Sequence, residues 1–197
     1  MSLNRNGFRR VLGVLAAVLL FAVTAAAQSS EQADVSNIKI KNFGQMDERF
    51  YRGAQPKEKD YQSLKELGIN TVIDLQAKPK EYEKRIVESL GMRYVNIPMV
   101  EKEYPTEEAV ASFLKLVDDP ATGKFYVHCA GGRHRTGAIG AVYRFTKYRW
   151  NYDQVYAEMK KFDFYTSWGH GDFKKFVQDY WSHMQATNTG TYNAGGR

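Results

Sequence analysis

The residue types that can do chemistry in this chain are concentrated in one segment, His128-Cys129-Ala130-Gly131-Gly132-Arg133-His134-Arg135-Thr136-Gly137. Cys129 is the only cysteine, and Arg135 follows it by six residues. The glycines permit a tight turn whose backbone N–H groups point inward and form a nest for an anion. A helix that begins there adds N–H donors and partial positive charge. The spacing therefore predicts a loop that holds a phosphate dianion over a thiolate.

Each residue type of this loop has a predicted task. Arg135 can grip two phosphate oxygens with its fork. Positive fields of this kind lower the pKa of cysteines from about 8.5 to about 3.5–7.5, so Cys129 is expected to be a thiolate at neutral pH and to act as the nucleophile. Thr136 can donate its hydroxyl to the sulfur, and His128 is expected to order the loop from behind. The substrate-binding residues expected here are Ala130, Gly131, Gly132, Arg133, His134 and Arg135.

The loop resembles the phosphate-binding loop of the protein tyrosine phosphatase superfamily, on its dual-specificity side. Its 132–137 end resembles the plant-and-fungal atypical dual-specificity phosphatases, which carry a basic residue and then histidine before the loop arginine. The segments 50–56 and 71–75 also resemble early strands of this family, so the resemblance covers residues 50 to 164 approximately. It implies a cysteine-based phosphatase fold and a thiophosphate intermediate on Cys129.

The general acid departs from the pattern of the family. The superfamily usually takes the leaving-group proton from an aspartate on a loop after a strand that ends in Ile-Pro. Here Pro98 is followed by Glu101 three residues later and by Glu103 two residues after that. A glutamate can transfer the same proton if it holds it at neutral pH. We expect Glu101 to be the acid, with Glu103 as the second candidate and Asp74 as a structural, supporting carboxylate.

No cofactor is expected, because the loop and its arginine neutralise the charge of the phosphate. The histidines show no spacing typical of metal ligands, so no metal is predicted. Arg133 and His134 are expected to be exposed and able to touch substrate, and Arg144 to add to the basic pocket. In phosphoinositide phosphatases of the superfamily, a basic residue at the position of Arg133 helps to bind further phosphates. The segment 165–171 either borders the pocket or only connects two helices, with Trp168 packed.

The first 27 residues have the pattern of a secretory signal peptide. Arg5, Arg9 and Arg10 precede an uncharged run over residues 11–27 that ends in three alanines before Gln28. Cleavage there predicts a periplasmic or secreted protein without stable insertion in a membrane, and an uncleaved N-terminal anchor is the alternative. Beyond residue 27 the chain has 25 basic and 22 acidic residues. This small excess argues against a nucleic-acid partner.

Apolar periodicity predicts an α/β fold with a central, mainly parallel sheet flanked by helices. Strands are expected over residues 50–54, 71–75, 92–97 (ended by Pro98) and 125–128. Helices are expected over residues 60–67, 80–90, 106–117, 136–148, 152–162 and 172–185. The predicted organisation is a signal peptide over 1–27, a loose lead-in over 28–45, a phosphatase domain over 46–186 and a flexible tail over 187–197. Cys129 then lies at the carboxyl end of a strand, where such sheets bind ligands.

The function predicted from these residues is a cysteine-dependent phosphomonoester hydrolase acting on phosphotyrosine in proteins, with phosphoserine and phosphothreonine as further targets. A phosphatase of inositol polyphosphates, inositol pyrophosphates or phosphoinositides is the alternative, so the partner is a phosphorylated protein or an anionic phosphorylated small molecule. Two other readings stay open: a sulfur transferase like rhodanese, which Thr136-Gly137 disfavours, and a catalytically weak phosphate-binding pseudophosphatase.

Overall fold

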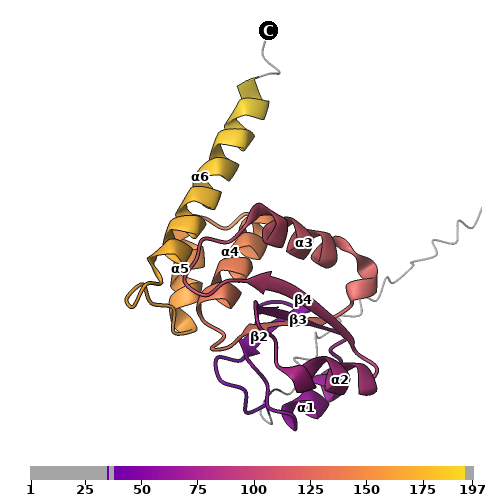
Figure 1. The fold of residues 1–197 in the computed structure, drawn as a ribbon. Helices are drawn as coiled ribbons and strands as arrows, with labels where there is room; N and C mark the ends of the chain where they lie inside the picture. The colour runs from indigo at the N-terminus through magenta and orange to yellow at the C-terminus, as the bar shows by residue number, and fades with distance from the viewer. Residues whose placement is uncertain (1–34, 36–37, 194–197) are drawn as a thin grey trace, which may run out of the picture. The chain divides into compact units, whose positions relative to one another are not determined.

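The computed structural model describes residue 35 and residues 38–193 (Figure 1). The predicted signal peptide over 1–27 lies outside the described residues. None of the helices in the part described is both long and apolar enough to cross a membrane.

A five-stranded sheet forms the centre of the fold. The strand order is β1 (Gly44–Gln45), β2 (Phe50–Ala54), β5 (Phe125–Cys129), β3 (Thr71–Gln76) and β4 (Arg93–Met99). β1 is antiparallel to β2, and the other neighbours are parallel. The prediction of a mainly parallel sheet in an α/β fold is confirmed. β5 occupies the middle of the sheet. The segment from Cys129 to Arg135, called the cysteine loop below, therefore lies at the middle of the carboxyl edge of the sheet.

Helices cover both faces of this sheet (Figure 1). They are α1 (Asp60–Glu66), α2 (Glu81–Ser89), α3 (Glu107–Asp118), α4 (His134–Tyr148), α5 (Tyr152–Lys161) and α6 (Gly171–Asn193). Successive residues of a strand point to opposite faces, and β3 shows the result: Val72 belongs to the core beneath α1 and α2, while Ile73 belongs to the larger core beneath α3 to α6.

Local sequence signals explain several helix boundaries. The Thr106 hydroxyl accepts a hydrogen bond from the backbone N–H of Ala109 and caps α3. Asn151 and Gln154 form a reciprocal capping box at the start of α5. Gly68, just after α1, has a φ of +85°, a conformation that glycine adopts without strain. The predicted end of α1 and the predicted starts of α3 and α5 are therefore confirmed within one residue.

The lead-in predicted over 28–45 is part of the fold from residue 38 onward. Ile40 is buried in the core beneath α1 and α2, together with the partly buried Ile38 and Phe43. The Ala54 N–H donates to the Lys41 carbonyl at 2.8 Å, which ties this segment to the end of β2. The sequence is polar on average here, but the apolar side chains spaced along it are enough to anchor it. The prediction of a loose segment is wrong for residues 38–45.

Two element ends also differ from the prediction. β4 does not end at Pro98 but continues through it to Met99. It is an edge strand, and its register with β3 shifts between Asp74 and Gln76, so a residue without an N–H is tolerated there. At the other end of the chain, α6 continues to Asn193, so residues 187–193 of the predicted flexible tail are helical.

Candidate active site

The cysteine loop connects the end of β5 to the start of α4 and lies against the end of β2. In the sheet, Cys129 pairs with Ala54. Gly132 has a φ of +65°, and a Cβ atom there would lie 2.4 Å from the carbonyl carbon of Gly53. Only glycine fits this close approach of two backbones. The sequence prediction of a glycine-dependent turn over the end of a strand is confirmed.

Cys129 is 3 % exposed, and the groups around it favour its thiolate form. Burial alone would raise the pKa of the thiol. The Arg135 guanidinium, the Thr136 hydroxyl and the backbone N–H groups of Thr136 and Arg133 outweigh burial, and the pKa lies below its ordinary value. The hydroxyl of Thr136 is buried and is not engaged by another group, so it is available to the sulfur of Cys129, whose pKa it lowers. The loop therefore stabilises negative charge on the sulfur of Cys129.

We expect replacement of Thr136 by valine to raise the pKa of Cys129. Valine has nearly the shape of threonine but cannot donate a hydrogen bond to the sulfur. Loss of one bond to a charged group corresponds to about one pKa unit, so the thiolate fraction at neutral pH should fall. The pH dependence of iodoacetamide alkylation, followed by mass spectrometry, measures this shift directly because Cys129 is the only cysteine.

Two variants serve as controls for this measurement. Thr136→Ser keeps the hydroxyl and should keep the midpoint. Thr146→Val removes a hydroxyl from the same helix, where it donates to the Val142 carbonyl at 2.8 Å, and should leave the midpoint unchanged. An identical midpoint in Thr136→Val and the native chain would contradict the assigned hydrogen bond.

Arg135 connects the cysteine loop to the end of β4. Its side chain is buried, with 7 % of the residue exposed, and its Nη1 donates to the Met99 carbonyl at 3.2 Å. The first N–H groups of α4 carry no side-chain cap, unlike those of α3 and α5. The Arg135 guanidinium and the N-terminus of α4 together provide hydrogen-bond donors for an anion over Cys129, as the predicted binding of phosphate requires.

Glu101 lies at the same hollow as Cys129, and Glu103 does not. This hollow measures about 110 Å³, and its lining includes Glu101 and the loop residues Cys129, Ala130, Gly131, Arg133, His134 and Arg135, but not Gly132. Glu103 lines a separate small hollow with Tyr104 and Thr106. Of the two candidates for the general acid, only Glu101 is brought to the nucleophile. Its role in proton transfer stays a prediction.

His128 lies behind the loop, fully buried, in contact with two carboxylates. Its Nε2 is 2.8 Å from Glu83 Oε1, and its Nδ1 is 3.8 Å from Asp74 Oδ1. Burial alone would lower the pKa of His128, but the hydrogen bond and charge of Glu83, with the charge of Asp74, raise it. The pKa of Glu83 is lowered despite burial, mainly by its bond to His128. His128 and Asp74, which the sequence predicts to support the loop, therefore lie next to each other in the structure.

Sequence reasoning missed Glu83. It lies in a run of charged residues at the start of α2, and nothing in that pattern distinguishes it from solvated neighbours. The ligand atoms of Asp74, Glu83 and His128 lie within 4.8 Å of one another, a set that a metal could use. The short contact between imidazole and Glu83 is that of a direct ion pair. The expectation that no metal is needed stays a prediction.

His134 is buried, which corrects the prediction that it is exposed. Its ring stacks on His170, with centroids 3.6 Å apart and planes at 2°, and its Nε2 contacts the Tyr165 carbonyl at 3.1 Å. Burial, followed by the charge of His170, lowers the pKa of His134 to about 4, so it is neutral at pH 7. Tyr165 and His170 both line the Cys129 hollow. The segment 165–171 therefore borders the pocket, and its Trp168 is 83 % exposed rather than packed.

The two other predicted cations differ in their surroundings. Arg133 lines the hollow; its guanidinium lies over the Tyr165 ring and its Nε is 3.8 Å from Asp163. Arg144 is buried on α4, where it pairs with Glu158 at 2.6 Å and donates to the Met46 carbonyl at 2.7 Å. Arg144 does not line the hollow, so the prediction that it adds to a basic pocket is wrong. Its charge is neutralised within the core.

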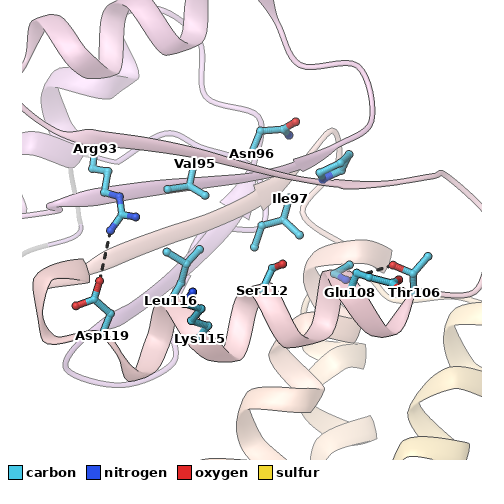
Figure 2. A pocket seen from close by; sticks show the side chains of 12 residues that line it. Arg93, Val95, Asn96, Ile97, Thr106, Glu108, Ser112, Lys115, Leu116 and Asp119 are labelled. Carbon is cyan, nitrogen blue, oxygen red and sulfur yellow. Dashed lines mark hydrogen bonds and ion pairs between the residues drawn. The ribbon is translucent and has the colours of Figure 1, made fainter.

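A larger hollow, of about 560 Å³, lies between β4 and α3, away from the cysteine loop (Figure 2). Val95, Ile97 and Leu116 point into it, and the ion pair between Arg93 and Asp119, at 3.7 Å, closes one end. Its lining contains neither Cys129 nor any other residue predicted to act on phosphate. The larger of the two hollows is therefore not the candidate active site.

The chain matches the model of one protein family, described as DSP-PTPase phosphatase fused to NAD+ kinase, over residues 21–176. This range contains the sheet, the cysteine loop, Glu101 and the supporting carboxylates.

Two individual proteins similar to the chain are named as phosphatases, and a solved structure shares its fold. It is 27 % identical over 157 residues to "Probable tyrosine-protein phosphatase DG1060" of Dictyostelium discoideum, covering 77 % of this chain and 90 % of that protein. It is 25 % identical to inositol diphosphatase SIW14 of Saccharomyces cerevisiae, covering 64 % of this chain and 47 % of that protein. The structure of TpbA from P. aeruginosa in complex with pTyr aligns with a TM-score of 0.59 at 22 % identity, covering 69 % of this chain and 82 % of that one.

Proposed function

The chain belongs to the family of DSP-PTPase phosphatases, and from that membership we propose that it hydrolyses phosphotyrosine in proteins, with Cys129 as nucleophile. The observation that carries the proposal is the position of Cys129 in a hollow with Arg135, where its pKa is lowered. As a member of the family it is a phosphoric monoester hydrolase. Its substrate, the role of each residue and its cellular location are the proposed part.

In the first step the Cys129 thiolate attacks phosphorus, and the bond from phosphorus to the leaving oxygen breaks. Protonated Glu101 gives its proton to that oxygen, so a neutral hydroxyl leaves and a thiophosphate remains on Cys129. Arg135 and the inward N–H groups of the loop stabilise the equatorial oxygens as charge redistributes. Because these donors are held in position beforehand, no reorganisation accompanies the transfer.

In the second step a water molecule attacks phosphorus, and the bond from sulfur to phosphorus breaks. The Glu101 carboxylate takes one proton from this water, which restores its acid form. Inorganic phosphate leaves, and the electron pair returns to the sulfur of Cys129. The Thr136 hydroxyl and Arg135 stabilise this returning thiolate, so the sulfur is a good leaving group.

Aromatic walls favour phosphotyrosine as the group bound. Tyr165, His170 and Phe173 line the hollow above Cys129. Flat aromatic rings of this kind pack on a phenyl ring at little cost in conformational entropy. The complex of TpbA with pTyr concerns a protein of this fold and is consistent with such a substrate.

The inositol diphosphates are the second candidate, favoured by cations near the hollow. Arg133 lines the hollow. Burial is the main cause that lowers the pKa of His170, and the charge of Lys102, the residue after Glu101, lowers it further. One cation in the lining of the hollow and a second that acts on a residue of that lining suit a substrate with several phosphates. The relative SIW14 is named an inositol diphosphatase.

Export remains part of the proposal. The basic start, apolar run and alanines of residues 1–27 support a cleaved signal peptide and a periplasmic or secreted enzyme. The chain has a single cysteine and so no internal thiol to resolve an oxidised Cys129. N-terminal sequencing of the protein from cell fractions tests this: a mature N-terminus at Gln28 in the exported fraction supports export, and an intact N-terminus in the cytosol contradicts it.

A panel of substrates tests the proposed function under reducing conditions. It contains para-nitrophenyl phosphate, a phosphotyrosine peptide, a phosphoserine peptide and an inositol diphosphate, with Arg133→Ala beside the native chain. We expect kcat/KM for the phosphotyrosine peptide to exceed that for the inositol diphosphate. Arg133→Ala should lower kcat/KM for the inositol diphosphate more than for the peptide. The reverse order would replace the main proposal with the second candidate. Phosphate binding without release from any substrate would identify a binding module instead.

A further inference from the structure

Three consecutive carbonyl groups of the cysteine loop accept hydrogen bonds from outside the loop. The Ala130 carbonyl accepts from the Gln55 N–H at 3.3 Å. The Gly131 carbonyl accepts from Asn42 Nδ2 at 2.8 Å, and the Gly132 carbonyl from Arg52 Nη2 at 2.7 Å. The loop is therefore held from its outer side at each of these peptides.

Peptide geometry gives these outer bonds a consequence for the inner face. In a planar trans peptide the C=O and the following N–H point in opposite directions, and the described peptide bonds are all trans. A donor that holds the Gly132 carbonyl outward therefore turns the Arg133 N–H inward. That N–H is one of the two backbone groups that hydrogen-bond to Cys129. By the same reasoning, Asn42 turns the Gly132 N–H inward.

Both side chains are firmly placed for this task. Arg52 is 1 % exposed, and its guanidinium lies 4.0 Å from the centroid of the Phe162 ring. Asn42 has a φ of +53°, a left-handed conformation that asparagine tolerates better than most residues. The preceding Lys41 carbonyl accepts from the Ala54 N–H, which fixes Asn42 beside the end of β2. Such strain in a well-held segment often accompanies function.

We propose that Asn42 and Arg52 are positioning residues of the phosphatase reaction, which hold the outward carbonyl groups of the loop so that its N–H groups converge on phosphate and on Cys129. The inference rests on the proposed function and extends it to two side chains outside the loop motif. Neither touches the substrate. Arg52 also adds a buried positive charge behind the nucleophile, and its charge and that of the Cys129 thiolate interact favourably.

The test measures binding of inorganic phosphate without requiring turnover. Iodoacetamide alkylates only Cys129, since the chain has no other cysteine, and bound phosphate should protect it. The concentration dependence of protection gives a dissociation constant, and the pH dependence of alkylation gives the midpoint of the thiol. The titratable and charged groups around this thiol are Arg52, Glu101, Tyr126, His128, Arg133, His134, Arg135, Tyr165 and His170, and each variant leaves all of them unchanged except the residue it replaces.

Asn42→Gly removes the donor and relieves the positive φ, so the variant should fold. Arg52→Lys keeps the buried charge but loses the fork. We expect each to weaken phosphate binding about tenfold, the factor that corresponds to about 1.4 kcal/mol, and to raise the midpoint of alkylation. Asn42→Asp, which sets an acceptor against the Gly131 carbonyl, should weaken binding further.

Asp47→Asn is the matched control for a general loss of stability. Asp47 accepts hydrogen bonds from Tyr143 and Tyr148 at 2.6 and 2.7 Å, away from the loop. It should lower the unfolding midpoint and leave the phosphate constant unchanged. Native constants and midpoints in Asn42→Gly and Arg52→Lys would overturn this proposal while the phosphatase function stands. A native chain that phosphate fails to protect would remove the proposed function as well.

Discussion

Replacing Cys129 with serine is expected to abolish phosphate release from every substrate, by a factor of about 10⁴ or more. A serine hydroxyl has a far higher pKa than a thiol, and the groups that lower the pKa of Cys129 cannot ionise it at neutral pH. Arg135 and the loop N–H groups remain, so phosphate and substrate should still bind. Release from a phosphotyrosine peptide measures the first effect, and calorimetric titration with inorganic phosphate measures the second.

The combination of lost turnover and retained binding is what identifies a nucleophile. Loss of both would indicate that the serine variant has a disturbed loop, which the unfolding midpoint checks independently. Release within tenfold of the native rate would contradict the mechanism, because another group would then attack phosphorus. Thr146→Val, a substitution of similar size on α4, should keep native turnover.

Replacing Glu101 with glutamine is expected to slow poor leaving groups far more than good ones. Glutamine keeps the shape of the side chain but has no proton to give at neutral pH. A positioned general acid contributes about 10²–10⁴-fold, so release from the phosphotyrosine peptide should fall by about 10²–10³-fold. Para-nitrophenolate leaves without protonation, so para-nitrophenyl phosphate should lose only a few-fold. A series of aryl phosphates with graded leaving-group pKa values measures the difference.

Glu103→Gln is the matched control for this series, because Glu103 lies two residues away but lines a different hollow. It should show native rates with all leaving groups. If the dependence on the leaving group appeared in Glu103→Gln and not in Glu101→Gln, the acid would be Glu103. If neither variant showed it, the proton would have to come from another group, and the role assigned to Glu101 would fall.

The cysteine loop could be predicted from the sequence because its geometry is local. Cys129, Gly132 and Arg135 are close along the chain, and a strand, a tight turn and a helix N-terminus bring them together without help from distant segments. The turn at Gly132 needs a residue without Cβ, and the sequence provides one. Glu101 was found in a different way, by its distance from Pro98.

The groups behind the loop could not be predicted in this way. Asn42 and the Gly131 carbonyl are 89 residues apart, and Arg52 and the Gly132 carbonyl are 80 residues apart. Their contact depends on the parallel register of β2 and β5, which no single-residue pattern encodes. Glu83 likewise meets His128 only because α2 packs on one face of the sheet.

The burial of individual charged and polar side chains also could not be predicted without the tertiary structure. A histidine between two arginines in a loop is typical of an exposed position, but His134 stacks on His170 from the segment between α5 and α6. Arg144 was expected near the phosphate, but Glu158 one helix later neutralises it.

The amino-acid sequence by itself determined the turn of the cysteine loop and the alternation of strands and helices, and it predicted Cys129 as the nucleophile, because these depend on neighbouring residues and on periodicity. Only the tertiary structure decided which acid faces the thiolate, which side chains orient the loop and which cations stay available to a substrate. These depend on contacts between segments up to 98 residues apart, and such contacts exist only once the sheet has set their register and the helices have closed over its faces.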